Sequence, residues 1–180
     1  MDSSYLKKLI PKDKFDIEPI PTLMKISEDE VKPILPELLF CVADMNWPIA
    51  AEMVKVLARF PNSIIPLIKE ILKPTETDEE WKYFIITDLI PKLPQNSQML
   101  LSNDIARIID CPTDEEKCSV WRVAKKYREE LGGKYESTED DFSELDIQFD
   151  ASKIAKELYD KAKAIGVMYQ KSEKSPHSSD

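Results

Sequence analysis

The chain has little glycine and almost no histidine. Its 180 residues include three glycines and one histidine, His177, close to the C-terminus. Three glycines cannot build the glycine-rich loops that hold phosphates in nucleotide-binding proteins. One terminal histidine provides neither a Ser-His or Cys-His catalytic pair nor a histidine-based zinc site. We therefore expect no catalytic residue, no metal site and no cofactor, and we predict that the protein is not an enzyme.

The sequence also lacks a disulfide pattern and a membrane-spanning run. Its cysteines are Cys41, Cys111 and Cys118, an odd number without C-x-x-C spacing, which favours a reducing compartment. Cys41 falls in the longest apolar run, residues 38–43, and we expect it to be buried. That run is far shorter than the roughly 20 residues that cross a bilayer. No apolar stretch of signal-peptide length follows the N-terminal lysines, so we predict a cytoplasmic protein without membrane contact.

Negative charge is in excess, with a net charge of −9. An acidic surface repels phosphate backbones, so we expect no nucleic-acid partner. Residues 135–150 contain seven acidic residues and no basic one, whereas lysines are frequent in residues 150–171. The simplest interpretation of this contrast is a solvated linker beside a solvated helix face.

A short apolar phrase occurs twice along the chain. Residues 34–39 (Ile-Leu-Pro-Glu-Leu-Leu) return as residues 64–69 (Ile-Ile-Pro-Leu-Ile-Lys). Asp44 with Trp47 returns, more loosely, as Asp78 with Trp81. A period of roughly 30–36 residues is typical of stacked two-helix repeats. We predict an all-α fold, a HEAT-like right-handed α-solenoid of about three helical hairpins plus a C-terminal helix.

Capping residues and apolar spacing give the expected helices. Three capping boxes, Ser27 with Glu30, Thr77 with Glu80 and Thr113 with Glu116, predict helix starts, and Pro36 predicts a kink or restart. Asn46 is expected to cap a helix that begins at Trp47 or Pro48. Asn62 or Ser63 is expected to cap the next helix, Asp16 a helix over about 17–26, and a further helix lies near 96–109. The residues expected to share one core are Ile34, Leu38, Leu39, Met53, Leu57, Ile64, Ile68, Ile71, Ile85 and Leu89.

The chain divides into four predicted parts. They are a helical-repeat domain (1–133), an acidic linker (134–149), a C-terminal amphipathic helix (150–170) and a disordered tail (171–180). The last helix has an apolar stripe, and an isolated helix of this length is only marginal in water. It either caps the open end of the solenoid beside Val120, Ala124 and Tyr127 or docks into a partner. The cap is the favoured interpretation, because terminal repeats need their apolar face covered.

Two surface segments are candidate binding sites. The first is an aromatic-acidic ridge, because tryptophan is enriched at interface hot spots. A structural interpretation competes with it: Asn46 and Pro48 start a helix and Trp47 packs on the preceding one. The ridge residues are Asp44, Asn46, Trp47, Asp78 and Trp81.

The second candidate is the turn-rich segment 11–16. Lys12, Asp13 and Asp16 are its candidate partner contacts. The competing interpretation is an N-terminal arm that closes the end of the solenoid, with Phe15 inserted into the first repeat.

Residues 9–131 resemble a family of small, uncharacterised bacterial helical-repeat domains related to HEAT repeats. The phrase Asn46-Trp47-Pro48 is the most specific part of the likeness. The residues that carry the resemblance are 9–16, 36–39, 44–50, 65–66, 68–72 and 81–83. The resemblance implies the helical-repeat fold and no established activity, and it does not include residues 134–180.

These observations favour a non-enzymatic protein-binding module that acts through shape and charge complementarity. The alternative is an immunity-type protein that neutralises a toxin, such as a basic nuclease, by covering its site with acidic residues. An enzyme that uses only carboxylates is a third hypothesis, for which nothing in the sequence marks a catalytic pair.

Overall fold

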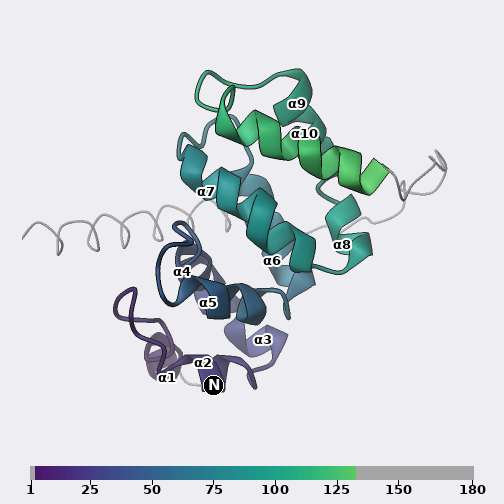
Figure 1. Ribbon diagram of the computed structural model, residues 1–180. Coiled ribbons are helices and arrows are strands. Elements are labelled where there is room, and N and C mark those ends of the chain that lie inside the picture. Colours follow the sequence, from purple (N-terminus) through teal and green to yellow (C-terminus); the bar gives the residue numbers. More distant parts are fainter. Residues whose placement is uncertain (1–2, 133–180) are drawn as a thin grey trace, which may run out of the picture.

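The computed structural model describes the backbone of residues 3–132 and the side chains of residues 4–130, and within that range every regular element is helical (Figure 1). The all-α class is therefore confirmed. The elements, in chain order, are α1 (Ser3–Lys7), α2 (Ile20–Leu23), α3 (Glu28–Val31), the 3₁₀ turn η1 (Lys32–Ile34), α4 (Leu35–Phe40), α5 (Ala50–Leu57), α6 (Pro61–Ile71), α7 (Glu79–Phe84), the π-helical turn η2 (Ile85–Leu89), the 3₁₀ turn η3 (Ile90–Lys92), α8 (Gln95–Met99), α9 (Ser102–Asp110) and α10 (Ser119–Gly132).

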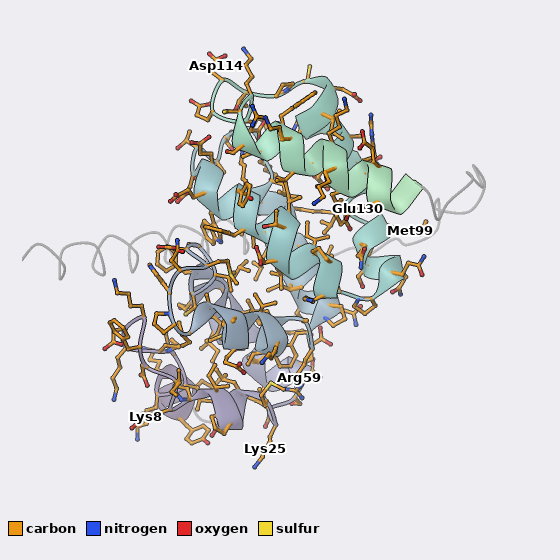
Figure 2. The ribbon with its side chains drawn as sticks, viewed as in Figure 1. Lys8, Lys25, Arg59, Met99, Asp114 and Glu130 are labelled. Carbon is orange, nitrogen blue, oxygen red and sulfur yellow. The ribbon has the colours of Figure 1, made fainter. Side chains whose placement is uncertain are left out.

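The helices stack along one direction of the molecule (Figure 1). α5 packs on α2 and α4, α4 on α6, and α10 on α7, η2 and α9. Lys8 and Lys25 lie at one end of the stack, and Asp114, in the turn between α9 and α10, lies at the other (Figure 2). Most packing partners are near neighbours in the chain, as short helical hairpins require.

One continuous apolar core runs through these helices. All ten residues predicted to share it are buried, with exposed fractions of at most 3%. The residues from both copies of the repeated phrase are among them. Their spacing of three and four residues puts them on one face of each helix, so the stripe is buried whichever neighbour covers it. Cys41 is also buried, as expected.

The helix expected over residues 27–43 is interrupted by its prolines. Glu30 accepts hydrogen bonds from the Ser27 amide (3.2 Å) and hydroxyl (2.6 Å), and α3 begins at Glu28. Pro33 falls in the 3₁₀ turn η1, and α4 restarts at Leu35 with Pro36 in its first turn. The predicted restart is confirmed, because a proline in the first turn removes no intrahelical bond.

Several predicted caps are wrong. α5 begins at Ala50 rather than at Trp47, and Asn46 does not cap it. α6 begins at Pro61, and its Ser63 amide donates to Glu28 Oε1 (2.8 Å), a carboxylate 35 residues earlier. The cap of α7 is Asp78 rather than Thr77, since Asp78 Oδ1 accepts from the Trp81 amide at 3.0 Å.

Three helix boundaries also differ from the expectation. Only Ile20–Leu23 is helical in the 17–26 segment, where Pro19 and Pro21 leave little room for a longer helix. The 96–109 helix is divided into α8 and α9. Thr113 and Glu116 form their capping box, but α10 begins later, at Ser119. The predicted linker, C-terminal helix and tail lie outside the described residues.

Candidate functional site

The loop between α1 and α2 is braced by its own aspartates. Asp13 Oδ1 accepts a hydrogen bond from the Phe15 amide at 2.8 Å. Asp16 accepts two: its Oδ2 from the Lys12 amide at 3.0 Å and its Oδ1 from the Glu18 amide at 3.3 Å. Aspartate side chains that bond nearby amides in this way replace the bonds that a helix would otherwise supply. The loop therefore has a defined shape without regular structure.

Two large apolar residues in the second half of this loop lie outside the core. Phe15 is 66% exposed and Ile17 is 57% exposed. The prediction that Phe15 fills the end of the first repeat is therefore wrong. The Lys14 ammonium group lies 5.7 Å from the centre of the Phe15 ring, which leaves most of the ring in solvent. A structured loop that exposes two such side chains gives up the favourable free energy of burying them.

The loop is attached to the turn that precedes α5. The Ile49 amide donates to the Lys14 carbonyl oxygen at 3.2 Å. The purple loop and the blue turn between α4 and α5 accordingly lie on the same side of the molecule (Figure 1). A small depression between them is lined by Pro11, Phe40 and Trp47 among others, and its volume of about 10 Å³ matches a single water molecule. The structure therefore unites two segments that the sequence analysis treated as separate candidates.

Asp44 organises the second segment. Its Oδ1 accepts from the Asn46 amide (2.8 Å) and from Asn46 Nδ2 (2.9 Å), and its carbonyl oxygen accepts from the Trp47 amide (3.1 Å). Asn46 and Pro48 are exposed, whereas Asp44 and Trp47 are half-buried. We call residues 12–18 and 44–48 together the loop surface.

The second pair of predicted ridge residues, Asp78 and Trp81, does not form a surface ridge with the first. Trp81 is only 2% exposed, so the expectation that it lies on a surface ridge is wrong. Phe40 contacts both tryptophans edge-to-face, with ring centres 5.7 Å from Trp47 and 5.7 Å from Trp81. Asp78 is exposed but serves as the cap of α7. The aromatic row is therefore mostly interior, and Trp47 is its outer member.

The carboxylates of the loop surface are not neutralised by ion pairs. In the described part of the chain, Asp13, Asp16, Glu18 and Asp44 take part in no ion pair. Three acids elsewhere do have such a partner, a lysine three residues later: Asp29–Lys32 (2.8 Å), Glu52–Lys55 (2.6 Å) and Asp114–Lys117 (2.5 Å). The loop surface does contain Lys12 and Lys14, so its four acids outnumber its basic residues.

The negative charge of Asp16 also affects the pKa of the buried Cys41 thiol. Burial raises the pKa of Cys41 to about 12, and the negative charge of Asp16 adds to that rise. The Cys41 thiol donates instead to the Glu37 carbonyl oxygen at 3.7 Å. Cys41 is therefore a packing residue and not a reactive thiol.

A buried ionic cluster that no sequence pattern predicted lies outside the loop surface. Glu116 is 0% exposed and Lys82 is 1% exposed, and their charged groups are 2.5 Å apart. Both terminal nitrogens of Arg107 also donate to the Glu116 carboxylate, and one of them donates to the Leu72 carbonyl oxygen. The only signal in the sequence was the capping box of Thr113 and Glu116, which did not indicate burial.

Hydrogen bonding decides the charge state of Glu116. Burial acts to raise the pKa of its carboxyl group, but the hydrogen bonds from Arg107, Lys82 and the Thr113 amide outweigh burial and lower it. The cluster links α6, α7, α9 and the turn before α10. Because its donors and acceptors satisfy one another, the cluster holds these elements together in the interior.

The described part of the chain shows neither a candidate metal site nor a candidate membrane-spanning helix. No three His, Cys, Asp or Glu side chains between residues 4 and 130 are grouped so that they could hold a metal ion. Among the described helices, none combines the length and apolar character that crossing a membrane needs.

The fold and this surface together define an all-helical domain with an exposed, acid-braced apolar loop. The chain belongs to the family described as "Domain of unknown function (DUF5071)", whose sequence profile matches residues 9–128. That range includes the loop surface and ends within α10. No curated protein matches the chain.

Proposed function

We propose that this protein is a non-enzymatic protein-binding module and that the loop surface is its binding site. The observation that carries the proposal is the pair of exposed apolar side chains, Phe15 and Ile17, on a loop whose shape is held by Asp13 and Asp16. Leaving both side chains in water is unfavourable for the isolated protein. A partner that covers them would recover that free energy.

Pre-organisation makes this loop a suitable anchor. A loop that already has its bound shape loses little conformational entropy when it binds. Aromatic side chains at the centre of an interface supply much of the binding energy, and polar groups around them exclude water. Phe15 and Ile17 would form that centre, with the neighbouring carboxylates and Trp47 at its edge.

Affinity capture from the native host, with two matched variants, tests the proposal. The double variant Phe15→Ser, Ile17→Ser removes the apolar side chains and keeps every aspartate that braces the loop. The control variant Met24→Ser, Leu100→Ser removes two other exposed apolar side chains, each 41% exposed. We expect a partner that wild type and control retain and the loop variant loses, with at least a tenfold weaker Kd in calorimetry with the purified partner. Equal capture by all three proteins would overturn the proposal.

The unpaired carboxylates favour a second candidate, an immunity-type protein that neutralises a basic toxin. Acidic groups that steer a basic partner increase the association rate, and salt weakens that effect. Such a protein would bind one partner tightly, with an association rate that falls steeply between low and physiological salt. A Kd unchanged by salt would reject this candidate.

The finer architecture belongs to the same proposal. Stacking of short helices and the repeated apolar phrase support a HEAT-like right-handed α-solenoid. The resemblance to bacterial helical-repeat domains supports a bacterial origin, and the absence of a disulfide pattern supports a cytoplasmic location. A scattering profile and an experimental structure of the full chain would test the solenoid.

A further inference from the structure

The loop surface has a specific chemical requirement for what binds it. Phe15 and Ile17 need an apolar counterpart. Asp13 and Asp16 accept backbone hydrogen bonds, and among the described residues Asp13, Asp16 and Glu18 have no cationic partner. An occupant that satisfies both features presents apolar and basic side chains together.

The chain itself contains a segment with this composition. In residues 150–171 five apolar residues recur at helical spacing, and five lysines outnumber the three acidic residues Asp150, Glu157 and Asp160. The apolar members are Ile154, Leu158, Ala162, Ile165 and Tyr169, and the lysines are Lys153, Lys156, Lys161, Lys163 and Lys171. An amphipathic sequence of this kind fits an apolar patch with an acidic rim.

The connecting chain is long enough for the segment to reach the loop surface. The described backbone ends at Gly132, and the residues from 133 to 149 can extend over roughly 56–61 Å. A domain of this size has a radius of gyration of about 14 Å, so that length exceeds its diameter. A tethered segment also acts at an effective concentration in the millimolar range, so a weak contact suffices.

The alternative docking place expected from the sequence is already covered. Val120, Ala124 and Tyr127 were the residues expected to receive the segment, and they are 0%, 0% and 7% exposed. α10 packs on α7, η2 and α9 through this side. The loop surface, by contrast, keeps its apolar residues exposed.

We propose that residues 150–171 dock on the loop surface of their own chain, with the apolar stripe covering Phe15 and Ile17 and the excess of lysines attracting the segment to the acidic rim. This inference rests on the proposed function, because it takes the loop surface as a binding site. Its consequence is autoinhibition: the segment competes with the external partner for the same residues.

Hydrogen exchange of the full-length protein tests the contact from both sides. The first variant changes Lys153, Lys156, Lys161 and Lys163 to Gln. The matched control makes the same change at four exposed lysines elsewhere: Lys25, Lys92, Lys125 and Lys126. In a third variant, Asp13→Asn and Glu18→Gln remove two negative charges and keep the loop hydrogen bonds, because Asp13 accepts with one oxygen only and Asp16, which accepts with both, is left unchanged.

We expect the first and third variants to exchange several-fold faster than wild type in both regions, 12–18 and 150–171, whereas the control does not. The acceleration must not depend on protein concentration. Acceleration confined to one region, or none, overturns the inference. Protection that disappears on dilution overturns docking within one chain and shows binding to a second copy.

Binding to the partner identified above separates the two proposals. If the segment occupies the loop surface, the first variant binds the partner about tenfold more tightly than wild type. If Phe15→Ser, Ile17→Ser loses the partner but the lysine variant changes neither exchange nor affinity, the proposed function stands and this inference fails. If the exchange results hold but the loop variant still binds the partner, the proposed function fails and the intramolecular contact stands.

Discussion

The carboxylate of Glu116 and the ammonium group of Lys82 form an ion pair of 2.5 Å between two side chains that are almost completely buried. The two residues are 34 positions apart in the chain. A charge taken out of water is costly unless a partner compensates it, so neither residue tolerates the loss of the other. Arg107 completes the cluster and connects it to the end of α6.

Removal of the Glu116 charge is expected to destabilise the fold strongly. Glu116→Gln leaves Lys82 buried without a counter-charge, which costs about 3–5 kcal/mol. Urea unfolding followed by circular dichroism measures the loss. The control is Glu115→Gln at the neighbouring exposed position, which should leave the free energy of unfolding nearly unchanged. If Glu116→Gln lowers the free energy of unfolding no more than the control does, the buried ionic cluster does not stabilise the fold.

The same carboxylate makes stability depend on acid pH. The pKa of Glu116 is lowered from its ordinary value of 4.5 in the folded protein. A carboxyl group with a depressed folded pKa contributes stability above its unfolded pKa and loses it as the pH falls through the folded pKa. The free energy of unfolding should therefore fall below about pH 4.5 more steeply in wild type than in Glu116→Gln. Parallel curves for the two proteins would show that Glu116 is not the group responsible.

Truncation of core side chains is expected to have the usual large cost. Leu57 and Ile68 are both fully buried, so replacing either by Ala should destabilise the protein by about 2–5 kcal/mol. Leu100→Ala, at an exposed site, serves as the control. Losses below half a kilocalorie per mole at both core sites would mean that the assigned helix faces are wrong.

Mutations at the expected caps of the two Asp-Trp segments, Asp78 and Asn46, should affect stability differently. Asp78 accepts from the Trp81 amide at the start of α7, so Asp78→Ala should cost about 1 kcal/mol. Asn46 caps no helix, so Asn46→Ala should be much closer to neutral. Thermal unfolding of the two variants provides the comparison, and the opposite order would reinstate Asn46 as a cap.

Thiol chemistry gives an independent measure of the fold. Cys111 and Cys118 are exposed, whereas Cys41 is buried and its pKa is raised to about 12 by burial and by Asp16. At neutral pH, two thiols should react quickly with a disulfide reagent and the third only after denaturation. Three rapid equivalents in the native protein would show that Cys41 is accessible.

Sequence patterns alone determined the helical class and the core. The stripes of Ile64, Ile68 and Ile71 and their counterparts repeat every three or four residues, and such a local period needs no knowledge of the neighbouring helix. The restart near Pro36 was predictable for the same reason, since the proline acts on its own backbone. The segments of the loop surface were also recognised, as two separate candidates.

Only the tertiary structure decided how distant polar and aromatic residues are used. Glu28 caps a helix that begins at Pro61, and Glu116 pairs with Lys82, because helices far apart in sequence pack together. Trp47 and Trp81 follow similar phrases, yet one lies at the surface and the other is buried behind Phe40. Phe15 is exposed because Asp13 and Asp16 hold its loop in a shape of its own. Burial and capping by distant side chains depend on which surfaces meet, and that information is not contained in any local period of the chain.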